Sequence, residues 1–277
     1  MSMPPDHPRS YFLGGYDLEM VTIRDWLQAR GARVFDKRLA WGAQASAYRA
    51  EIVRELACGR TAVLVELEDD LGVTSGPGAS QCYSVDHHFR RAGRDVPTAL
   101  EQVFQLEAGA PDEWTRWMTL VAANDRGHLR ALQEVAATQE EMRRIRAADR
   151  AAQGVTESEE VSAGVAVRQA QLLFDGQLTV VHLPHERTSA AVDALDALLG
   201  GPGFRNLLVF TPGSQSFYGE GRAVRRLDDR FPGGYYGGEL PERGFWGHSQ
   251  RQEESALLEL LRSVFPATVS SPDRVMN

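Results

Sequence analysis

Three consecutive polar residues, Asp86, His87 and His88, follow a short apolar run and offer side chains that ligate metals and transfer protons. Residues that leave a strand in succession point to opposite sides, so one imidazole can bind a metal ion while the other faces a substrate. The Asp86 carboxylate can hold a ring nitrogen of the metal-binding histidine. A polar turn that happens to hold two histidines explains the same tripeptide. Both interpretations stay open on these residues alone.

Carboxylates at three further places could complete a site for a hard cation, which needs several oxygen ligands from separate strand ends. Asp17 and Glu19 lie two residues apart after the first apolar run, and Glu66 and Glu68 follow the run TAVLV. Asp125 follows another apolar segment. Each of these residues alone is the ordinary solvated carboxylate that often ends an element. Their shared placement favours a metal site.

The elements that must position these residues follow from the hydrophobic pattern. Short apolar runs alternate with longer amphipathic ones from Tyr11 onward, which is typical of βα units and a mainly parallel sheet. Open α/β sheets bind ligands at the carboxyl ends of their strands, and the polar residues lie there. We expect strands over residues 10–14, 32–35, 61–66 and 81–85, and helices over 18–30 and 43–57.

The rest of the chain predicts a connector and a second, smaller α/β domain. Helical spacing covers residues 98–106 and 113–123 and breaks at 124–127. A long charged helix then begins near His128, and its interleaved charges predict a solvated surface. Further strands are expected over 178–183 and 206–210, and further helices over 189–199 and 253–264. The polar stretch 154–162 is the preferred boundary. The predicted division is a first domain over 1–127, a helical connector over 128–162 and a second domain over 163–277.

Bulk composition excludes several classes of protein. The chain has 277 residues, 43% of them hydrophobic, and a formal net charge of −8, which argues against coating a long nucleic acid. Two cysteines are too few for a disulfide framework. The amino terminus has no signal-peptide pattern, and no apolar stretch is long enough to span a bilayer. We therefore expect a cytoplasmic protein without a membrane partner.

The acidic and histidine segments occur in a recognisable order: LGGYDLE over residues 13–19, Glu66 after TAVLV, then Asp86-His87-His88, then Asp125. This order resembles the DHH phosphoesterase superfamily over nearly the whole chain. That superfamily includes RecJ-type nucleases, oligoribonucleases, cyclic-dinucleotide phosphodiesterases and family II pyrophosphatases. Its third motif is matched outright by residues 86–88.

The other motifs match with changes. The family pattern H-x-x-x-D-x-D is similar to residues 13–19, where Asp17 and Glu19 fill the acidic positions but Leu13 stands in place of the histidine. Glu66 is the nearest counterpart of the second-motif Asp, with Glu68 as a rival, and Asp125 is similar to the fourth-motif Asp. Leu13 and the two glutamates leave open a one-metal site, a divergent enzyme or a protein that no longer catalyses.

The resemblance also implies roles for these residues. Asp17 and Glu66 would bind one Mn²⁺, and a second Mn²⁺ would be bound by Glu19, Glu66, His87 and Asp125. Asp86 and His88 would be catalytic, with His88 contacting the scissile phosphate or the leaving group.

A glycine-rich segment over residues 231–238 resembles the GGGH segment of the DHH-associated domain in position and composition. Glycines let the backbone approach a phosphate closely. The substrate-binding residues implied are Arg222, Gly233, Gly234, Gly237 and Gly238. A surface turn also explains the glycines, and the neighbouring Arg225 and Arg226 are open to interpretation as plain charges on a helix face.

The sequence therefore predicts a metal-dependent phosphoesterase-like hydrolase with one or two Mn²⁺ ions. Its partner would be a small phosphate-bearing ligand, namely a small nucleotide, a cyclic dinucleotide or a short oligonucleotide. The alternative is a catalytically inactive DHH-fold module that binds a nucleotide or another protein. A homodimer or a subunit of a larger assembly stays open.

Overall fold

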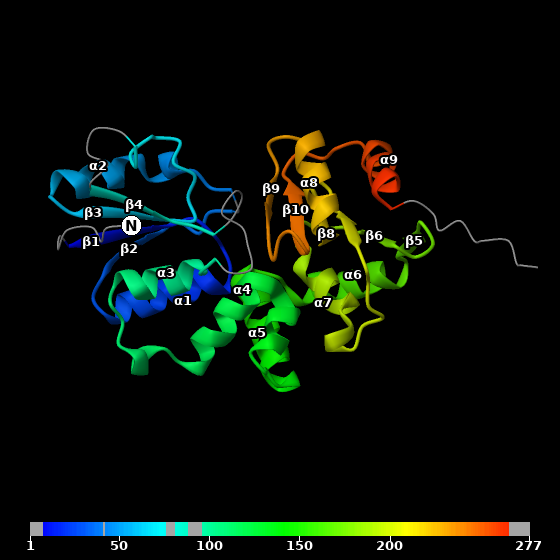
Figure 1. Cartoon of the computed structure of the whole chain (residues 1–277), viewed down its shortest axis with the longest axis horizontal. Helices are drawn as coiled ribbons and strands as arrows, with labels where there is room; N and C mark the ends of the chain where they lie inside the picture. Colours follow the sequence, from blue (N-terminus) through cyan, green and yellow to red (C-terminus); the bar gives the residue numbers. More distant parts are fainter. Residues whose placement is uncertain (1–7, 41, 76–80, 88–95, 266–277) are drawn as a thin grey trace, which may run out of the picture. The chain divides into compact units, whose positions relative to one another are not determined.

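The computed structural model describes residues 8–40, 42–75, 81–87 and 96–265, and the chain divides into two compact units (Figure 1). The first unit comprises Met1–Thr156 with Tyr235–Leu240, and the second comprises Glu157–Gly234 with Pro241–Asn277. The main boundary lies inside the polar stretch 154–162. The three-part division with a separate connector stays a prediction.

The first unit is built on a four-stranded parallel sheet, which confirms the predicted α/β class. Its strands are β1 (Arg9–Leu13), β2 (Arg33–Asp36), β3 (Thr61–Val65) and β4 (Cys82–Val85), in the order β2-β1-β3-β4. Each neighbouring pair runs parallel. Every residue of β3 is buried, as expected for a central strand covered on both faces. The carboxyl ends of β1, β3 and β4 therefore meet at one edge.

Helices cover both faces of this sheet (Figure 1). A 3₁₀ turn (Ala45–Tyr48) and α2 (Arg49–Ala57) cover one face, and α1 (Leu18–Ala29) and α3 (Ala99–Leu106) lie on the other. Phe12 and Leu64 pack against Tyr48 in the core beneath α2. Their neighbours along the strands point to the opposite face because side chains alternate.

Two further helices complete the first unit. α4 (Arg116–Glu134) is kinked, with non-helical backbone angles at Gly127 and His128, and α5 (Gln139–Ala152) follows a capping box. The kink overlaps only the last residue of the predicted break at 124–127, because residues 124–126 stay helical. The single long helix expected from His128 is instead divided between the end of α4 and α5. The expected solvated surface is wrong for Arg146 and Asp149 of α5, which are buried.

The chain's other sheet is mixed and has six strands in the order β5-β6-β7-β8-β10-β9, of which β5 to β8 and β10 belong to the second unit. β6 and β7 confirm the two predicted strands and run parallel, while β5 with β6, β7 with β8, and β8 with β10 are antiparallel. The strands are β5 (Gln171–Leu173), β6 (Leu178–His182), β7 (Leu207–Phe210), β8 (Gln215–Glu220), β9 (Tyr235–Gly237) and β10 (Arg243–His248).

Four helices accompany this sheet: α6 (Glu157–Arg168), α7 (Ser189–Leu195), α8 (Gly221–Arg230) and α9 (Glu254–Val264). α6 packs against α7 and β6, while α8 packs on β8 and β10 beside α9. Across the described ranges, no helix combines the length and the apolar character that crossing a membrane requires.

Candidate metal centre

The connection from β1 to α1 is tight and positions two carboxylates. Asp17 is the N-cap of α1, and its Oδ1 accepts a hydrogen bond from the backbone N of Met20 over 2.9 Å. Glu19 lies in the first turn and is buried, with Oε1 accepting a hydrogen bond from the backbone N of Leu100 in the first turn of α3 over 2.8 Å. The second oxygen of each carboxylate is therefore left to other partners.

Gly14 makes the close approach of β1 and β3 possible. A Cβ added at Gly14 would lie 2.1 Å from the backbone oxygen of Glu66, which no side chain could tolerate. The backbone N of Gly14 donates to the carbonyl of Val65 over 2.8 Å, so the two strand ends stay joined just before their acidic residues. The glycine therefore brings Glu66 beside the turn that carries Asp17 and Glu19.

Glu66 has an unusual backbone for a residue with a side chain. Its φ is +52°, in the left-handed region that costs an L residue roughly 1–2 kcal/mol. Its backbone N still donates to the carbonyl of Val85 over 2.8 Å, so the conformation is fixed by β4. The side chain is only 3% exposed. Strain of this kind clusters at functional sites, and here it turns a carboxylate inward.

His87 lies at the centre of the acidic group. Its Nε2 is 2.7 Å from Oδ2 of Asp125, 3.1 Å from Oε1 of Glu66 and 3.8 Å from Oε2 of Glu19. The ligand atoms of these four residues all lie within 4.8 Å of one another. Two groups that follow β3 and β4 and two that lie in α1 and α4 thus converge at the carboxyl edge of the parallel sheet, where ligands bind in open α/β folds.

The pKa values of these groups shift in one direction. Burial is the largest influence on His87 and lowers its pKa, but the charges and hydrogen bonds of Asp125 and Glu66 together raise it well above its ordinary value. Burial, followed by the charge of Asp125, raises the pKa of Asp17 and of Glu19 well above their ordinary values. These side chains therefore bind protons more tightly than they would in water, because the negative charge of the carboxylates exceeds the positive charge beside them.

The donor set fits a divalent cation. Among the described residues, Asp17 Oδ2 and Glu19 Oε2 are buried and accept no hydrogen bond. Gly15 leaves room beside them, since a Cβ added there would lie 3.3 Å from Asp17 Oδ2 and 3.5 Å from Glu66 Oε2. Buried oxygens with one imidazole suit a divalent transition metal. Glu19, Glu66, His87 and Asp125 could hold such an ion, with Asp17 close by.

No protein-family model matches the sequence, and no curated protein matches it. Among solved structures, the chain is similar to an exopolyphosphatase-related protein from Bacteroides fragilis, with 11% identity and a TM-score of 0.54. The match covers 94% of this chain and 92% of that protein. The chain therefore has a DHH-type fold.

Two other solved structures match at lower TM-scores. RecJ from Thermus thermophilus, in complex with Mn²⁺, is 15% identical, with a TM-score of 0.47 over 98% of this chain. The chain matches 53% of that RecJ, or about half its length. A pGpG-specific phosphodiesterase from Vibrio cholerae is 10% identical, with a TM-score of 0.39 over 94% of this chain and 99% of its own.

Within the DHH fold, not every predicted site residue joins the four-residue group. Asp86 is half-buried, and its backbone oxygen accepts a hydrogen bond from Gln102 Nε2 over 3.2 Å. His88 lies outside the described residues. Leu13, at the position of the family histidine, is 0% exposed. Glu68 is exposed, and its Oε2 accepts a bond from Gln44 Nε2, so the structure separates it from the cluster while Glu66 enters it.

The predicted substrate-binding residues lie on α8 and around β9. Arg222 is exposed, and its Nε donates to Oε2 of Glu220 over 2.7 Å. Gly234 packs tightly, because an added Cβ would lie 2.7 Å from the Gly247 oxygen and 2.8 Å from Trp246 Nε1. Gly233 and Gly238 have positive φ, and Gly237 ends β9. Local packing thus accounts for Gly234 without a ligand.

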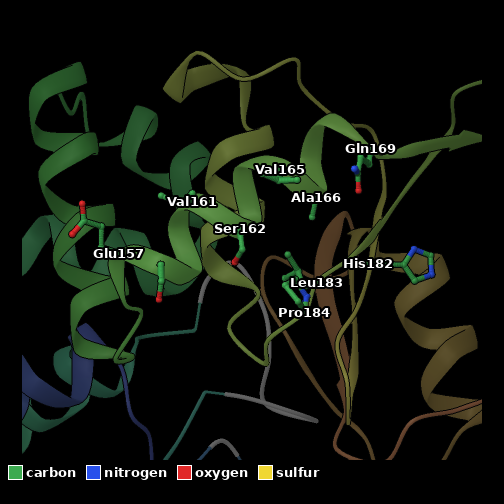
Figure 2. A pocket seen from close by; sticks show the side chains of 10 residues that line it. Glu157, Val161, Ser162, Val165, Ala166, Gln169, His182, Leu183 and Pro184 are labelled. Atoms are coloured by element: carbon green, nitrogen blue, oxygen red, sulfur yellow. The ribbon is translucent and has the colours of Figure 1, made fainter.

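The second unit also contains an open pocket of about 860 Å³ beside α6 (Figure 2). One wall is the face of α6 that carries Val161, Val165 and Ala166, and the other is formed by Leu183 and Pro184 after β6. The residues predicted to bind substrate do not line this pocket. Polar side chains also line it, but none of the lining residues is an Arg or a Lys that would bind a phosphate.

Proposed function

We propose that the chain is a metal-dependent phosphoesterase-like hydrolase that acts on a small nucleotide, a cyclic dinucleotide or a short oligonucleotide. The observation that supports it most is the convergence of His87 with three carboxylates at the carboxyl edge of a DHH-fold sheet. Mn²⁺ is the proposed ion because an oxygen-rich set with one imidazole lies between the preferences of Mg²⁺ and Zn²⁺. Either one or two ions would be bound.

Glu19, Glu66, His87 and Asp125 would hold the ion, and Asp17 with Glu66 would hold a second one. A divalent ion bound there supplies Lewis-acid chemistry to a phosphate ester. His87 must give up its proton to become a ligand, and burial of the carboxylates limits competing water. The Leu100 amide keeps Glu19 turned so that Oε2 faces His87.

Residues outside the four-residue group would contact the substrate. Asp86 and His88 would be catalytic, and Arg222 with the glycines at 233, 234, 237 and 238 would bind a terminal phosphate. A guanidinium fork suits a phosphate well. Arg222 is exposed, so a ligand phosphate can reach the guanidinium, although it would compete with the carboxylate of Glu220 that Nε now contacts.

The test is hydrolysis of dinucleotides and cyclic dinucleotides by chain purified with Mn²⁺. His87→Ala should lose product release, whereas His182→Ala should keep it, because His182 is an exposed histidine of the second unit paired with Glu254. Equal release by wild type and His87→Ala would contradict the proposal, as would the absence of release from every substrate with Mn²⁺ bound.

One observation favours a second candidate, a catalytically inactive nucleotide-binding module. Leu13 is fully buried where the family has a metal-binding histidine, so one ligand of the first ion is lost. Calorimetry separates the two functions. Nucleotide affinity with no turnover and no retained metal would support the inactive module.

A further inference from the structure

A buried ion pair on α5 contacts two segments that carry candidate metal ligands. Arg146 and Asp149 are 3% and 4% exposed, and Arg146 Nη1 donates to Asp149 Oδ2 over 2.7 Å. The same Nη1 donates to Oδ1 of Asn124 over 2.9 Å. Asp149 Oδ1 accepts a hydrogen bond from the backbone N of Leu18 over 3.2 Å. The pair therefore joins α5 to α1 and to α4.

The contacted residues are chain neighbours of the candidate ligands. Leu18 lies between Asp17 and Glu19, and Asn124 directly precedes Asp125. The first amides of a helix have no partner within the helix. In α1, Asp149 takes the Leu18 amide and Asp17 takes the Met20 amide, so the first turn is fixed from two sides. The fixed first turn of α1 in turn sets where the Glu19 side chain points.

Stability alone does not account for this arrangement. Burying two charges costs desolvation, and an apolar pair of similar volume often stabilises a fold equally well or better. An apolar pair, however, could not bond the Leu18 amide and the Asn124 side chain. The charged pair fixes the directions of two segments that come from distant parts of the chain.

We infer that Arg146 and Asp149 are positioning residues that set the affinity of the centre for a divalent ion, a role that rests on the proposed function. They act through Leu18 and Asn124 on the backbone that carries Glu19 and Asp125. Groups that orient metal ligands in this way typically change metal affinity by about 10- to 100-fold when they are removed.

The test variant combines Arg146→Met with Asp149→Leu, because this double change leaves the net charge of the pair at zero and removes the bonds to the Leu18 amide and to Asn124. Isothermal titration with MnCl₂ should show a Kd about 10- to 100-fold weaker than that of the wild type. The control is Glu55→Gln, which alters another buried carboxylate of the first unit. Glu55 is bonded by Ser10 and Arg33 near the amino ends of β1 and β2, at the opposite edge of the sheet. Its Kd should match the wild type.

Arg146→Lys is the second variant, should the double variant fail to fold. It keeps the charge but has a compact ammonium in place of the guanidinium, so a smaller loss of affinity is expected. Hydrogen exchange of the wild type gives an independent measurement, in which the Leu18 amide should be protected. Wild-type Mn²⁺ affinity in a folded variant, or an unprotected Leu18 amide, overturns the positioning role alone. Absence of Mn²⁺ binding by the wild type contradicts the proposed function and the positioning role together.

Discussion

Nε2 of His87 lies 2.7 Å from Oδ2 of Asp125, although one residue follows a strand and the other lies within a helix. This pair joins the end of β4 to α4 just before the kink at Gly127. At this distance, a proton held between the two side chains would occupy the place where a metal ion would bind both. Metal and proton must therefore compete for the centre.

The competition predicts a pH dependence of stability. The folded chain raises the pKa of His87 above 6.5, and burial raises those of Asp17 and Glu19 above 3.8 and 4.5. All three groups bind protons more tightly in the folded than in the unfolded chain. The stability that they contribute is complete below the ordinary value of each group and is lost as pH rises through the folded pKa. Chain prepared with chelator should thus become less stable above the ordinary pKa of His87.

Mn²⁺ should reverse this trend, because the ion replaces the protons. Thermal unfolding with and without Mn²⁺ should show a Tm increase that grows from about pH 6 to about pH 8. The buffer and the ionic strength must stay constant across the series. A metal-induced increase that is independent of pH would contradict the assignment of His87 as a ligand.

Gly14→Ala should damage both the fold and the site. The new Cβ meets backbone atoms of Glu66 and Val65, which cannot move aside as a flexible side chain could. Overpacking of this kind costs about 1–3 kcal/mol or more. Denaturant unfolding should show that loss, whereas Gly164→Ala in α6 should raise stability by roughly 0.5–1 kcal/mol, since its nearest contact is the end of the long Arg168 side chain. Equal effects of the two changes would argue against the close approach of β1 and β3.

Glu66→Gly should separate stability from metal binding. The change removes a carboxylate but relieves the strain of a left-handed residue, which is worth roughly 1–2 kcal/mol. The variant should therefore keep a wild-type Tm without metal and lose the Tm increase with Mn²⁺. Ala108→Gly is the control, because Ala108 also has positive φ but lies after α3. It should keep the response to Mn²⁺. A full response in Glu66→Gly would contradict the role of Glu66.

The strands of the first unit could be predicted from the sequence where both of their faces are buried, because such strands are continuous apolar runs. The run TAVLV became β3, and the acidic residues after each strand met because parallel strands end at one edge. Asp17 shows the limit of this reasoning. Its type and spacing match those of a ligand, but one of its oxygens caps α1, which only the backbone geometry reveals.

Some elements of the second unit could not be predicted because few of their residues are apolar. α6 buries only Ala163 and Ala166, so its sequence is as polar as that of a linker. β8 begins with the buried polar residue Gln215, whose amide bonds backbone groups beyond β10, and such a strand lacks apolar alternation. The contact between Leu18 and Asp149 joins residues 131 positions apart. A charged residue in an amphipathic helix does not disclose such a partner.

The most direct test is an anomalous-scattering map from crystals grown with Mn²⁺. We expect a peak bounded by Glu19, Glu66, His87 and Asp125, at distances that permit direct ligation. A map with no peak among these four residues, from crystals in which Mn²⁺ is present in excess, would contradict the metal centre and the function proposed from it.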